Sequence, residues 1–278
     1  MKTAIITGAN RGMGFEETKA VAEAGYRVIM ACYCPSQSQD AMEQIKRETG
    51  NDQIEILPLD LANFQSVRDF ARMVGERFIH LDLLMNNAGT LETGRHITVD
   101  GIERTVSVNF AGPFLLTHLL LPLMGEGTRI VNMASLVYAF GRISLPELFT
   151  QGCKGAFNRL IVYSNSKLAM TLFSLRLAQR LKGRGITVNA VDPGVVNTEI
   201  IRMQMFFDPL TDWFFRPFIR TPRQGADTAI RLLLEEEKAG ITGRFWRSNK
   251  ALNLGSKYEQ HPMMEQLWSE TERIVGLA

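Results

Sequence analysis

The hydrophobic and polar positions along the chain alternate between two periods. Short apolar runs rich in β-branched residues predict buried strands, and apolar residues three and four positions apart predict amphipathic helices between them. The predicted strands cover residues 3–6, 27–32, 54–59, 81–85, 129–134, 186–191 and, as a short last strand, 243–246. One predicted helix begins after residue 14, and the others cover residues 41–48, 67–78, 102–121, 162–181 and 223–235.

This repeated strand–helix alternation is typical of a parallel sheet that lies between two layers of helices. We therefore expect an α/β fold, a Rossmann-type doubly wound sheet of about seven strands, formed as a single domain over residues 1–278. Segments 136–159 and 199–221 interrupt the alternation, and both follow the carboxyl ends of strands, where such sheets bind ligands. We expect them to be substrate loops, and we expect a C-terminal helix at about residues 262–274.

A glycine-rich turn follows the first predicted strand, with the sequence Thr7-Gly8-Ala9-Asn10-Arg11-Gly12-Met13-Gly14. Gly8 permits a tight turn, and Gly12 and Gly14 carry no side chain that would keep a pyrophosphate away from the first turn of the following helix. The spacing is TGxxxGxG. A strand, this turn and a helix in that order predict a dinucleotide site.

Tyr163 and Lys167 lie four residues apart on a predicted helix, so their side chains share one face. A free tyrosine has a pKa of about 10, and a neighbouring ammonium favours its phenolate, so we expect Lys167 to lower the pKa of Tyr163. Tyr163 can then exchange a proton with a carbonyl or alcohol oxygen. Ser135, at the carboxyl end of strand 129–134, can hydrogen-bond the same oxygen.

Composition narrows the classes of function that remain. The net charge is +2, and no Lys/Arg run is interleaved with aromatics, so we expect no nucleic-acid partner. Three cysteines, Cys32, Cys34 and Cys153, form no disulfide framework, and the four histidines show no metal-binding spacing. No leader and no membrane-spanning run is evident, so we expect a cytoplasmic protein without stable membrane insertion and without a metal site.

The glycine turn, the tetrapeptide Asn86-Asn87-Ala88-Gly89 and the Tyr163/Lys167 pair together resemble the short-chain dehydrogenase/reductase family, over residues 2–244. The sequences at residues 163–169 and 189–198, and the long interval between Ser135 and Tyr163, resemble its retinol-dehydrogenase-like branch.

The resemblance implies roles for individual residues. Asn109 would complete a catalytic tetrad with Ser135, Tyr163 and Lys167, its backbone holding a water that links Lys167 to solvent; the plainer alternative is an asparagine that bends a long helix. Lys167 would also bind the nicotinamide ribose. The implied cofactor-binding residues are Gly8, Asn10, Arg11, Gly12, Met13, Gly14, Tyr33, Asp60, Leu61, Asn87, Ala88, Gly89, Tyr163, Lys167, Pro193, Gly194, Val196 and Thr198.

The sequence favours NADP over NAD as cofactor. An acidic residue at the end of the second strand would bind the ribose 2′-hydroxyl and reject a 2′-phosphate, and none occurs at residues 31–34. Arg11 lies where NADP-preferring relatives often carry a cation that pairs with the 2′-phosphate. Tyr33, however, stands where members of this branch usually have an arginine, so NAD remains an alternative.

Segment 203–218 is dense in aromatic residues and methionine. It fits a lid over an apolar substrate, a membrane or partner contact, or a helix packed on the domain. The leading hypothesis is an NAD(P)-dependent oxidoreductase acting on a hydrophobic ketone, aldehyde or alcohol. The alternatives are a C=C double-bond reductase and a non-catalytic dinucleotide sensor. Family members often associate through their long helices, so the resemblance also points to a homo-oligomer.

Overall fold

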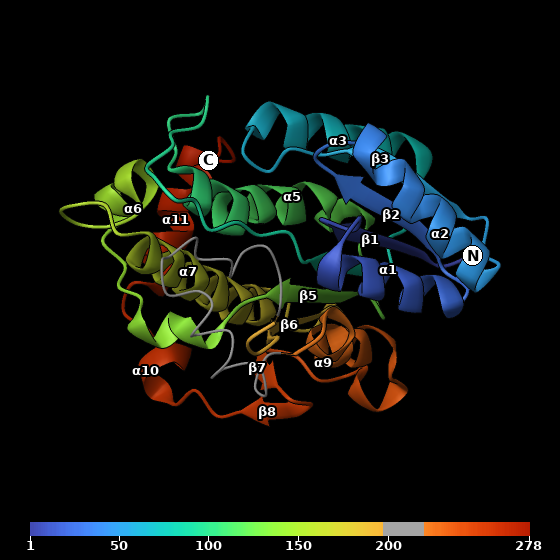
Figure 1. Ribbon diagram of the computed structural model, residues 1–278. Coiled ribbons are helices and arrows are strands. Elements are labelled where there is room, and N and C mark those ends of the chain that lie inside the picture. Colours follow the sequence, from blue (N-terminus) through green and yellow to red (C-terminus); the bar gives the residue numbers. More distant parts are fainter. Residues whose placement is uncertain (197–219) are drawn as a thin grey trace.

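A computed structural model describes residues 1–196 and 220–278 of the chain. Its strands form one sheet in the order β3-β2-β1-β4-β5-β6-β7-β8, and every neighbouring pair except β7–β8 is parallel (Figure 1). The strands are β1 (Thr3–Thr7), β2 (Arg27–Cys32), β3 (Ile54–Pro58), β4 (Leu83–Asn86), β5 (Arg129–Met133), β6 (Thr187–Asp192), β7 (Arg244–Arg247) and β8 (Lys250–Leu252). The expected doubly wound α/β fold is confirmed.

The eighth strand is the part of the sheet that the sequence did not predict. β7 turns back into β8 through Ser248 and Asn249, which have φ angles of 48° and 63°. Positive φ at both central residues is typical of the tight turn that matches the twist of a two-stranded hairpin. Glycine usually provides this conformation, and neither position is glycine, so the usual sequence signal is missing.

Helices cover both faces of the sheet (Figure 1). On one face, α1 packs against α2 and α9; on the other, α5 packs against α3, and α7 lies over β5 and β6. The helices and helical turns are α1 (Gly12–Glu23), η1 (Ser36–Ser38), α2 (Gln39–Thr49), α3 (Phe64–Arg77), α4 (Arg104–Val106), η2 (Ser107–Ala111), α5 (Gly112–Leu120), η3 (Leu121–Leu123), η4 (Leu136–Phe140), α6 (Leu145–Gln151), α7 (Arg159–Arg180), α9 (Pro222–Leu234), η6 (Glu236–Lys238), α10 (Ser256–Glu259) and α11 (Met264–Ile274).

Alternate strand residues supply two cores, one on each face. Ile5 and Ile29 point to the α3, α5 and α7 side, whereas Ile6 and Met30 point to the α1, α2 and α9 side. All four are essentially inaccessible to solvent. Burial on both faces explains why these strands are continuous apolar runs.

The predicted helix 102–121 is divided in the structure. It consists of α4, the π-helical turn η2 and α5. The stretch Arg104–Leu123 is long and apolar enough to cross a membrane, with a mean hydropathy of 1.5, but 67% of it is buried inside the protein. Its apolar composition is accounted for here by packing between the sheet and its neighbouring helices.

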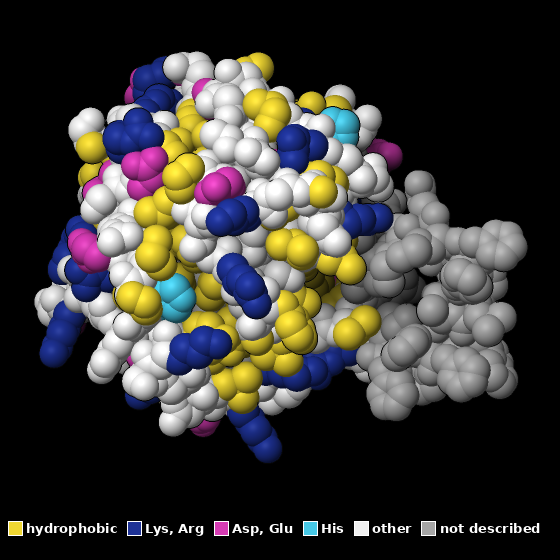
Figure 2. Space-filling model, turned by 90° about the vertical axis from the view of Figure 1, so that its left-hand side faces the viewer, with side chains coloured by type: hydrophobic (Ala, Val, Ile, Leu, Met, Phe, Trp, Pro, Cys, Tyr) yellow, Lys and Arg dark blue, Asp and Glu magenta, His cyan; other side chains and the backbone are white. Residues whose placement is uncertain are grey.

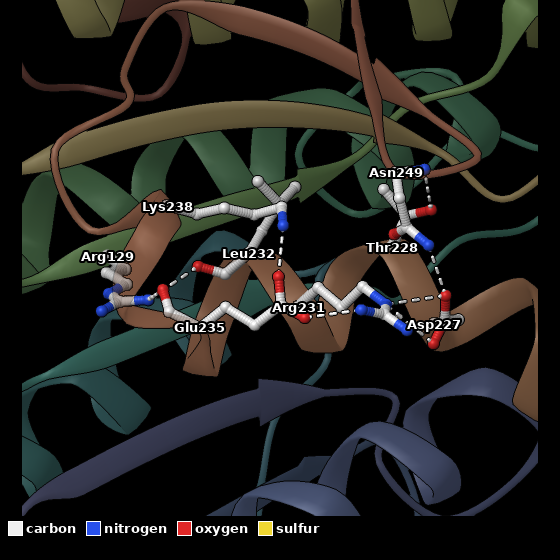
Figure 3. Close-up of polar contacts among 8 residues, drawn as sticks. All are labelled: Arg129, Asp227, Thr228, Arg231, Leu232, Glu235, Lys238 and Asn249. Carbon is white, nitrogen blue, oxygen red and sulfur yellow. Dashed lines mark hydrogen bonds and ion pairs between the residues drawn. The ribbon is translucent and has the colours of Figure 1, made fainter.

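Helix α9 is fixed to the sheet and to the β7–β8 hairpin by polar contacts (Figure 3). The buried Arg129 of β5 donates to the carbonyl oxygens of Leu232 (3.4 Å) and Glu235 (2.7 Å) at the end of α9. At the hairpin, Asn249 donates from its side chain to Asp227 (2.7 Å) and from its backbone to Thr228 (3.1 Å). The hairpin is therefore held against α9 on one side and β6 on the other.

The helix expected in the tail corresponds to α11, which packs against α7. Trp268 lies edge-on to Phe114 of α5, with ring centroids 5.2 Å apart, and 5.8 Å from Phe173 of α7. The guanidinium of Arg180 covers its outer face at 4.2 Å. Aromatic burial and a cation–π contact thus dock the C-terminal helix.

Candidate active site

A cleft of about 580 Å³ opens at the carboxyl ends of the strands, at the switch point where β1 lies between β2 and β4. Twelve of the predicted cofactor residues line it: Gly8, Asn10, Arg11, Gly12, Met13, Gly14, Tyr33, Asp60, Leu61, Asn87, Ala88 and Gly89. The remaining lining residues, which were not among the predicted cofactor residues, are Thr7, Ala31, Cys34, Gln37, Leu59, Thr90, Arg104, Val108 and Pro222.

The glycine turn has no room for side chains at the positions that matter. A Cβ atom on Gly14 would lie 2.2 Å from the carbonyl oxygen of Gly8 and 2.6 Å from Nδ2 of Asn87. Gly8 and Gly12 have φ angles of 65° and 57°, in the left-handed region. The turn therefore brings bare backbone to the first residues of α1, which fits a pyrophosphate at that helix terminus.

Asn87 and Ala88 connect the turn to the end of β4. Asn87 donates from Nδ2 to the carbonyl oxygens of Thr7 (2.9 Å) and Gly8 (3.3 Å), and the backbone N–H of Ala88 donates to Oγ1 of Thr7 (3.0 Å). The side chain of Asn87 is therefore occupied in holding the turn, and the cleft wall beside it is mainly backbone.

At the end of β2 the cleft is lined by uncharged side chains. Tyr33, which is 69% exposed, Cys34 and Gln37 follow the strand, and Arg11 approaches from the glycine turn. A hydrogen-bonding contact with the Ser36 hydroxyl lowers the pKa of the Cys34 thiol. The sequence analysis did not predict Gln37 at the cleft, because it lies beyond the end of the strand in a 3₁₀ turn, which has no recognisable periodicity in the sequence.

Tyr163 and Lys167 lie on α7, which begins at Arg159 after the N-cap Asn158. The ammonium of Lys167 lies 5.5 Å from the centre of the Tyr163 ring and donates to the carbonyl oxygen of Met133 (2.9 Å), the last residue of β5. Ser135 follows two residues later and caps η4, which packs along α7. The structure thus brings these three residues to adjoining elements.

The ionisation of the pair differs from the sequence-based expectation. Burial of the phenol, and then the negative charge of Asp192, raise the pKa of Tyr163, where Lys167 was expected to lower it. Burial lowers the pKa of Lys167 to about 8, against the opposite effect of Asp192. The expectation was wrong because the cost of burying a phenolate exceeds the benefit of the nearby ammonium. Near neutral pH the site therefore holds a neutral phenol beside a protonated lysine.

Asn109 lies in the π-helical turn η2, with its side chain fully engaged. Its Oδ1 accepts from the backbone N–H of Thr90 (2.8 Å), and its Nδ2 donates to the Thr90 carbonyl (2.9 Å) and to Oγ of Ser166 (3.0 Å). A Cβ atom on Gly89 would lie 3.3 Å from Asn109 Oδ1 and 3.7 Å from Lys167 Nζ. Asn109 and Lys167 therefore lie against Gly89, a residue that lines the cleft. π-Helical turns such as η2 are frequent at functional sites.

The loop after β6 carries the remaining predicted residues. Arg220 donates from Nη1 to the carbonyl oxygen of Pro193 (3.0 Å), and Val196 pairs with Arg220 in an isolated β-bridge. Five residues that were expected to bind the cofactor are not among those that line the cleft: Tyr163, Lys167, Pro193, Gly194 and Val196. Thr198, all of segment 203–218 and residues 199–219 of segment 199–221 lie outside the described residues. In the described part of the chain, no group of three His, Cys, Asp or Glu side chains is arranged to hold a metal ion.

Comparison with known proteins identifies the class to which this fold and cleft belong. The family model described as Enoyl-(Acyl carrier protein) reductase matches residues 8–247. Human retinol dehydrogenase 11 is 37% identical over 278 residues, covering 99% of this chain and 86% of that protein. Human retinol dehydrogenase 13 is 35% identical over 283 residues, covering 99% and 85%.

Solved structures agree with the sequence matches. A putative uncharacterized protein from Mycobacterium paratuberculosis superimposes with a TM-score of 0.79 at 27% identity, covering 99% of this chain and 94% of the other. A short-chain dehydrogenase from Burkholderia cenocepacia in complex with NADP gives a TM-score of 0.72 at 25% identity, covering 88% and 95%.

The chain belongs to the short-chain dehydrogenase/reductase family, and within it to the retinol-dehydrogenase-like branch. It is an NAD(P)-dependent oxidoreductase that acts on alcohol or carbonyl groups, as the sequence analysis predicted.

Proposed function

We propose that this enzyme is an NADP-dependent reductase or dehydrogenase of a hydrophobic aldehyde, ketone or alcohol. The observation that carries the proposal is the glycine-walled cleft: Gly89 lines it, the side chains of Asn109 and Lys167 lie against Gly89, and Tyr163 lies beside Lys167. A nicotinamide cofactor held by the cleft residues supplies or accepts the hydride when bound.

The side chains would then handle the oxygen and the proton of the substrate. Tyr163 is a neutral phenol near neutral pH, so it is ready to donate its proton to a carbonyl oxygen that becomes an alcohol. Ser135 would hydrogen-bond that oxygen and stabilise the negative charge that develops on it. Lys167 would favour the phenolate left after proton transfer, and Asn109 would keep the π-turn and Thr90 in place around it.

Three features favour NADP. The residues after β2 that line the cleft are uncharged, so nothing there repels a 2′-phosphate, and Arg11 offers a cation at the same end. One structurally similar enzyme, from Burkholderia cenocepacia, is in complex with NADP. NAD remains the alternative because Tyr33 supplies no second cation.

A hydrophobic substrate is favoured by the surface that surrounds the loop after Ser135. On the face that carries α6 and the start of α7, hydrophobic side chains lie among lysines and arginines (Figure 2). Phe140, Leu160 and Ile161 are 80%, 53% and 48% exposed, and they lie within five residues of Ser135 or Tyr163 along the chain. The names of the relatives, retinol dehydrogenases, indicate an apolar alcohol for those enzymes.

Reduction of a C=C double bond is the second candidate, because the matching family model is described as an enoyl reductase. A cytoplasmic location and association into a homo-oligomer remain part of the proposal. Cell fractionation and light scattering test those two points.

The deciding experiment is a panel of apolar aldehydes, ketones and enones, offered with NADPH or NADH and followed by nicotinamide absorbance. We expect alcohol products, with deuterium from labelled NADPH on the former carbonyl carbon, and at least about tenfold higher kcat/KM with NADPH. Deuterium on a former C=C carbon would favour the second candidate. Binding of NADPH without turnover of any compound would favour a dinucleotide sensor.

A further inference from the structure

Asp192, the last residue of β6, connects two loops at the site with one carboxylate. Its Oδ1 accepts from the backbone N–H of Leu136 (2.9 Å), and its Oδ2 accepts from the backbone N–H of Gly194 (3.2 Å). Leu136 directly follows Ser135, and Gly194 belongs to the turn after β6. The carboxylate therefore fixes the distance between the serine loop and that turn, although they are more than 50 residues apart in sequence.

The β7–β8 hairpin supports Asp192 from the outside. Arg247 Nε lies 3.3 Å from Asp192 Oδ2. Arg220 donates from Nη2 to Ser248 Oγ (2.7 Å) and from Nη1 to the carbonyl oxygen of Pro193. The hairpin is itself tied to α9 through Asn249 (Figure 3). Asp192 is thus held in one orientation by elements on both sides.

The charge of Asp192 acts on the proton-handling pair. Its side chain is only 3% exposed, so its field is weakly screened. That negative charge raises the pKa of Tyr163, of Lys167 and of Tyr138. The guanidinium of Arg247 contacts the carboxylate directly, and that of Arg220 lies at the same turn through its bond to the Pro193 carbonyl oxygen. For Lys167, the carboxylate opposes the effect of burial and favours the ammonium.

On the basis of the function proposed above, we propose that Asp192 is a positioning residue. Its buried carboxylate holds Ser135 in register with the Pro193–Gly194 turn, and it places a negative charge directly after Val191, the strand partner of Met133, to whose carbonyl oxygen Lys167 donates. Arg247 tempers that charge, because its guanidinium partly neutralises the carboxylate. Two substitutions therefore have opposite electrostatic effects on Lys167, which a purely structural role would not produce.

The test uses the full chain with ¹⁵N-labelled lysine, so that the pKa of Lys167 is measured by NMR independently of turnover. Lys167→Met assigns the signal. In parallel, the pH profile of carbonyl reduction is recorded. We expect Asp192→Asn to lower both the Lys167 pKa and the alkaline limb of the profile by at least about 0.5 pH unit, and to reduce kcat about tenfold. We expect Arg247→Gln to move the pKa and the limb upward.

Glu55→Gln is the matched control, because Glu55 is also a carboxylate paired with an arginine, Arg77 at 2.7 Å, but on edge strand β3. It should move neither quantity. The proposal would be overturned if Asp192→Asn left the Lys167 pKa and the alkaline limb unchanged, or if Asp192→Asn and Arg247→Gln shifted them in the same direction. If Asp192→Asn does not fold, the direction of the Arg247→Gln shift decides. Opposite NMR shifts in an enzyme that turns over no carbonyl would support the charge role and refute the proposed function alone.

Discussion

At the residue scale, the least expected group is Glu17 of α1. Its side chain is fully buried, and within the described part of the chain neither carboxylate oxygen has a hydrogen-bond partner. Burial raises the pKa of this carboxyl well above its usual value. The sequence analysis missed Glu17, although Met13, Ala20 and Val21 lie three or four residues away and therefore place it on the apolar face of the helix.

Glu17 predicts a stability that depends on pH. The folded-state pKa of Glu17 is above its unfolded value of about 4.3. The contribution of this carboxyl to stability is therefore fully present below about pH 4.3 and is lost as the pH rises through the folded-state pKa. Glu17→Met should raise Tm at pH 7 by about 3–8 °C, and the gain should shrink towards pH 4.5. Glu23→Met, exposed on the same helix, is the control. An equal gain at both pH values would contradict this account.

Lys167 predicts the alkaline limit of activity. Since burial lowers its pKa to about 8, the lysine loses its charge above that pH and no longer favours the Tyr163 phenolate. The kcat/KM for carbonyl reduction should fall about tenfold per pH unit above pH 8. Circular dichroism over the same range checks that the fold persists. A profile that stays flat to pH 10 would show that this charge is not required.

At the element scale, most strands and helices were predictable because burial gives each a characteristic spacing of apolar residues: continuous runs in the strands, and every three or four positions in the helices. The predicted strand 186–191 and helix 162–181, for instance, correspond to β6 and α7 within two or three residues at each end. Two elements depend on local conformations that leave no such period. The π-turn at Asn109 adds a residue within one helix, and the β7–β8 turn uses Ser248 and Asn249 instead of glycine.

Only the parts of the site that are short sequence motifs were predictable. The glycine turn and the Tyr163/Lys167 spacing are local, so the sequence displays them directly. The links from Asp192 to Leu136 and from Asn109 to Thr90 are contacts between separate elements. The raised pKa of Tyr163 likewise depends on burial, which no spacing reports.

The glycine turn predicts a sharp contrast between two Gly→Ala substitutions. In Gly14→Ala the new Cβ would meet backbone at 2.2 Å, so we expect NADPH affinity to fall at least about 100-fold or the fold to be destabilised. In Gly75→Ala, in α3, nothing lies within 4 Å, so stability should rise by about 0.5–1 kcal/mol with cofactor binding unchanged. Cofactor titration and thermal melts measure both. Normal binding and stability in Gly14→Ala would contradict the described turn.

At the scale of the whole molecule, the C-terminal helix closes one side of the core. Trp268 is 4% exposed and contacts aromatic rings of α5 and α7, so α11 covers part of these two helices. Trp268→Ala should cost about 3–5 kcal/mol in the free energy of unfolding. Gln266→Ala, exposed on the same helix, should change it little. Equal denaturation midpoints for the two variants would show that α11 is not docked in solution.

We infer that Tyr163 supplies the proton to a carbonyl oxygen beside a cofactor held in the glycine-walled cleft. Tyr163→Phe removes the phenol oxygen and keeps the ring that lies beside Lys167. The most direct measurement is single-turnover reduction by this variant, together with its NADPH dissociation constant. The account predicts a rate at least about 1,000-fold lower, with NADPH binding within about threefold of the wild type. Turnover at the wild-type rate would contradict it.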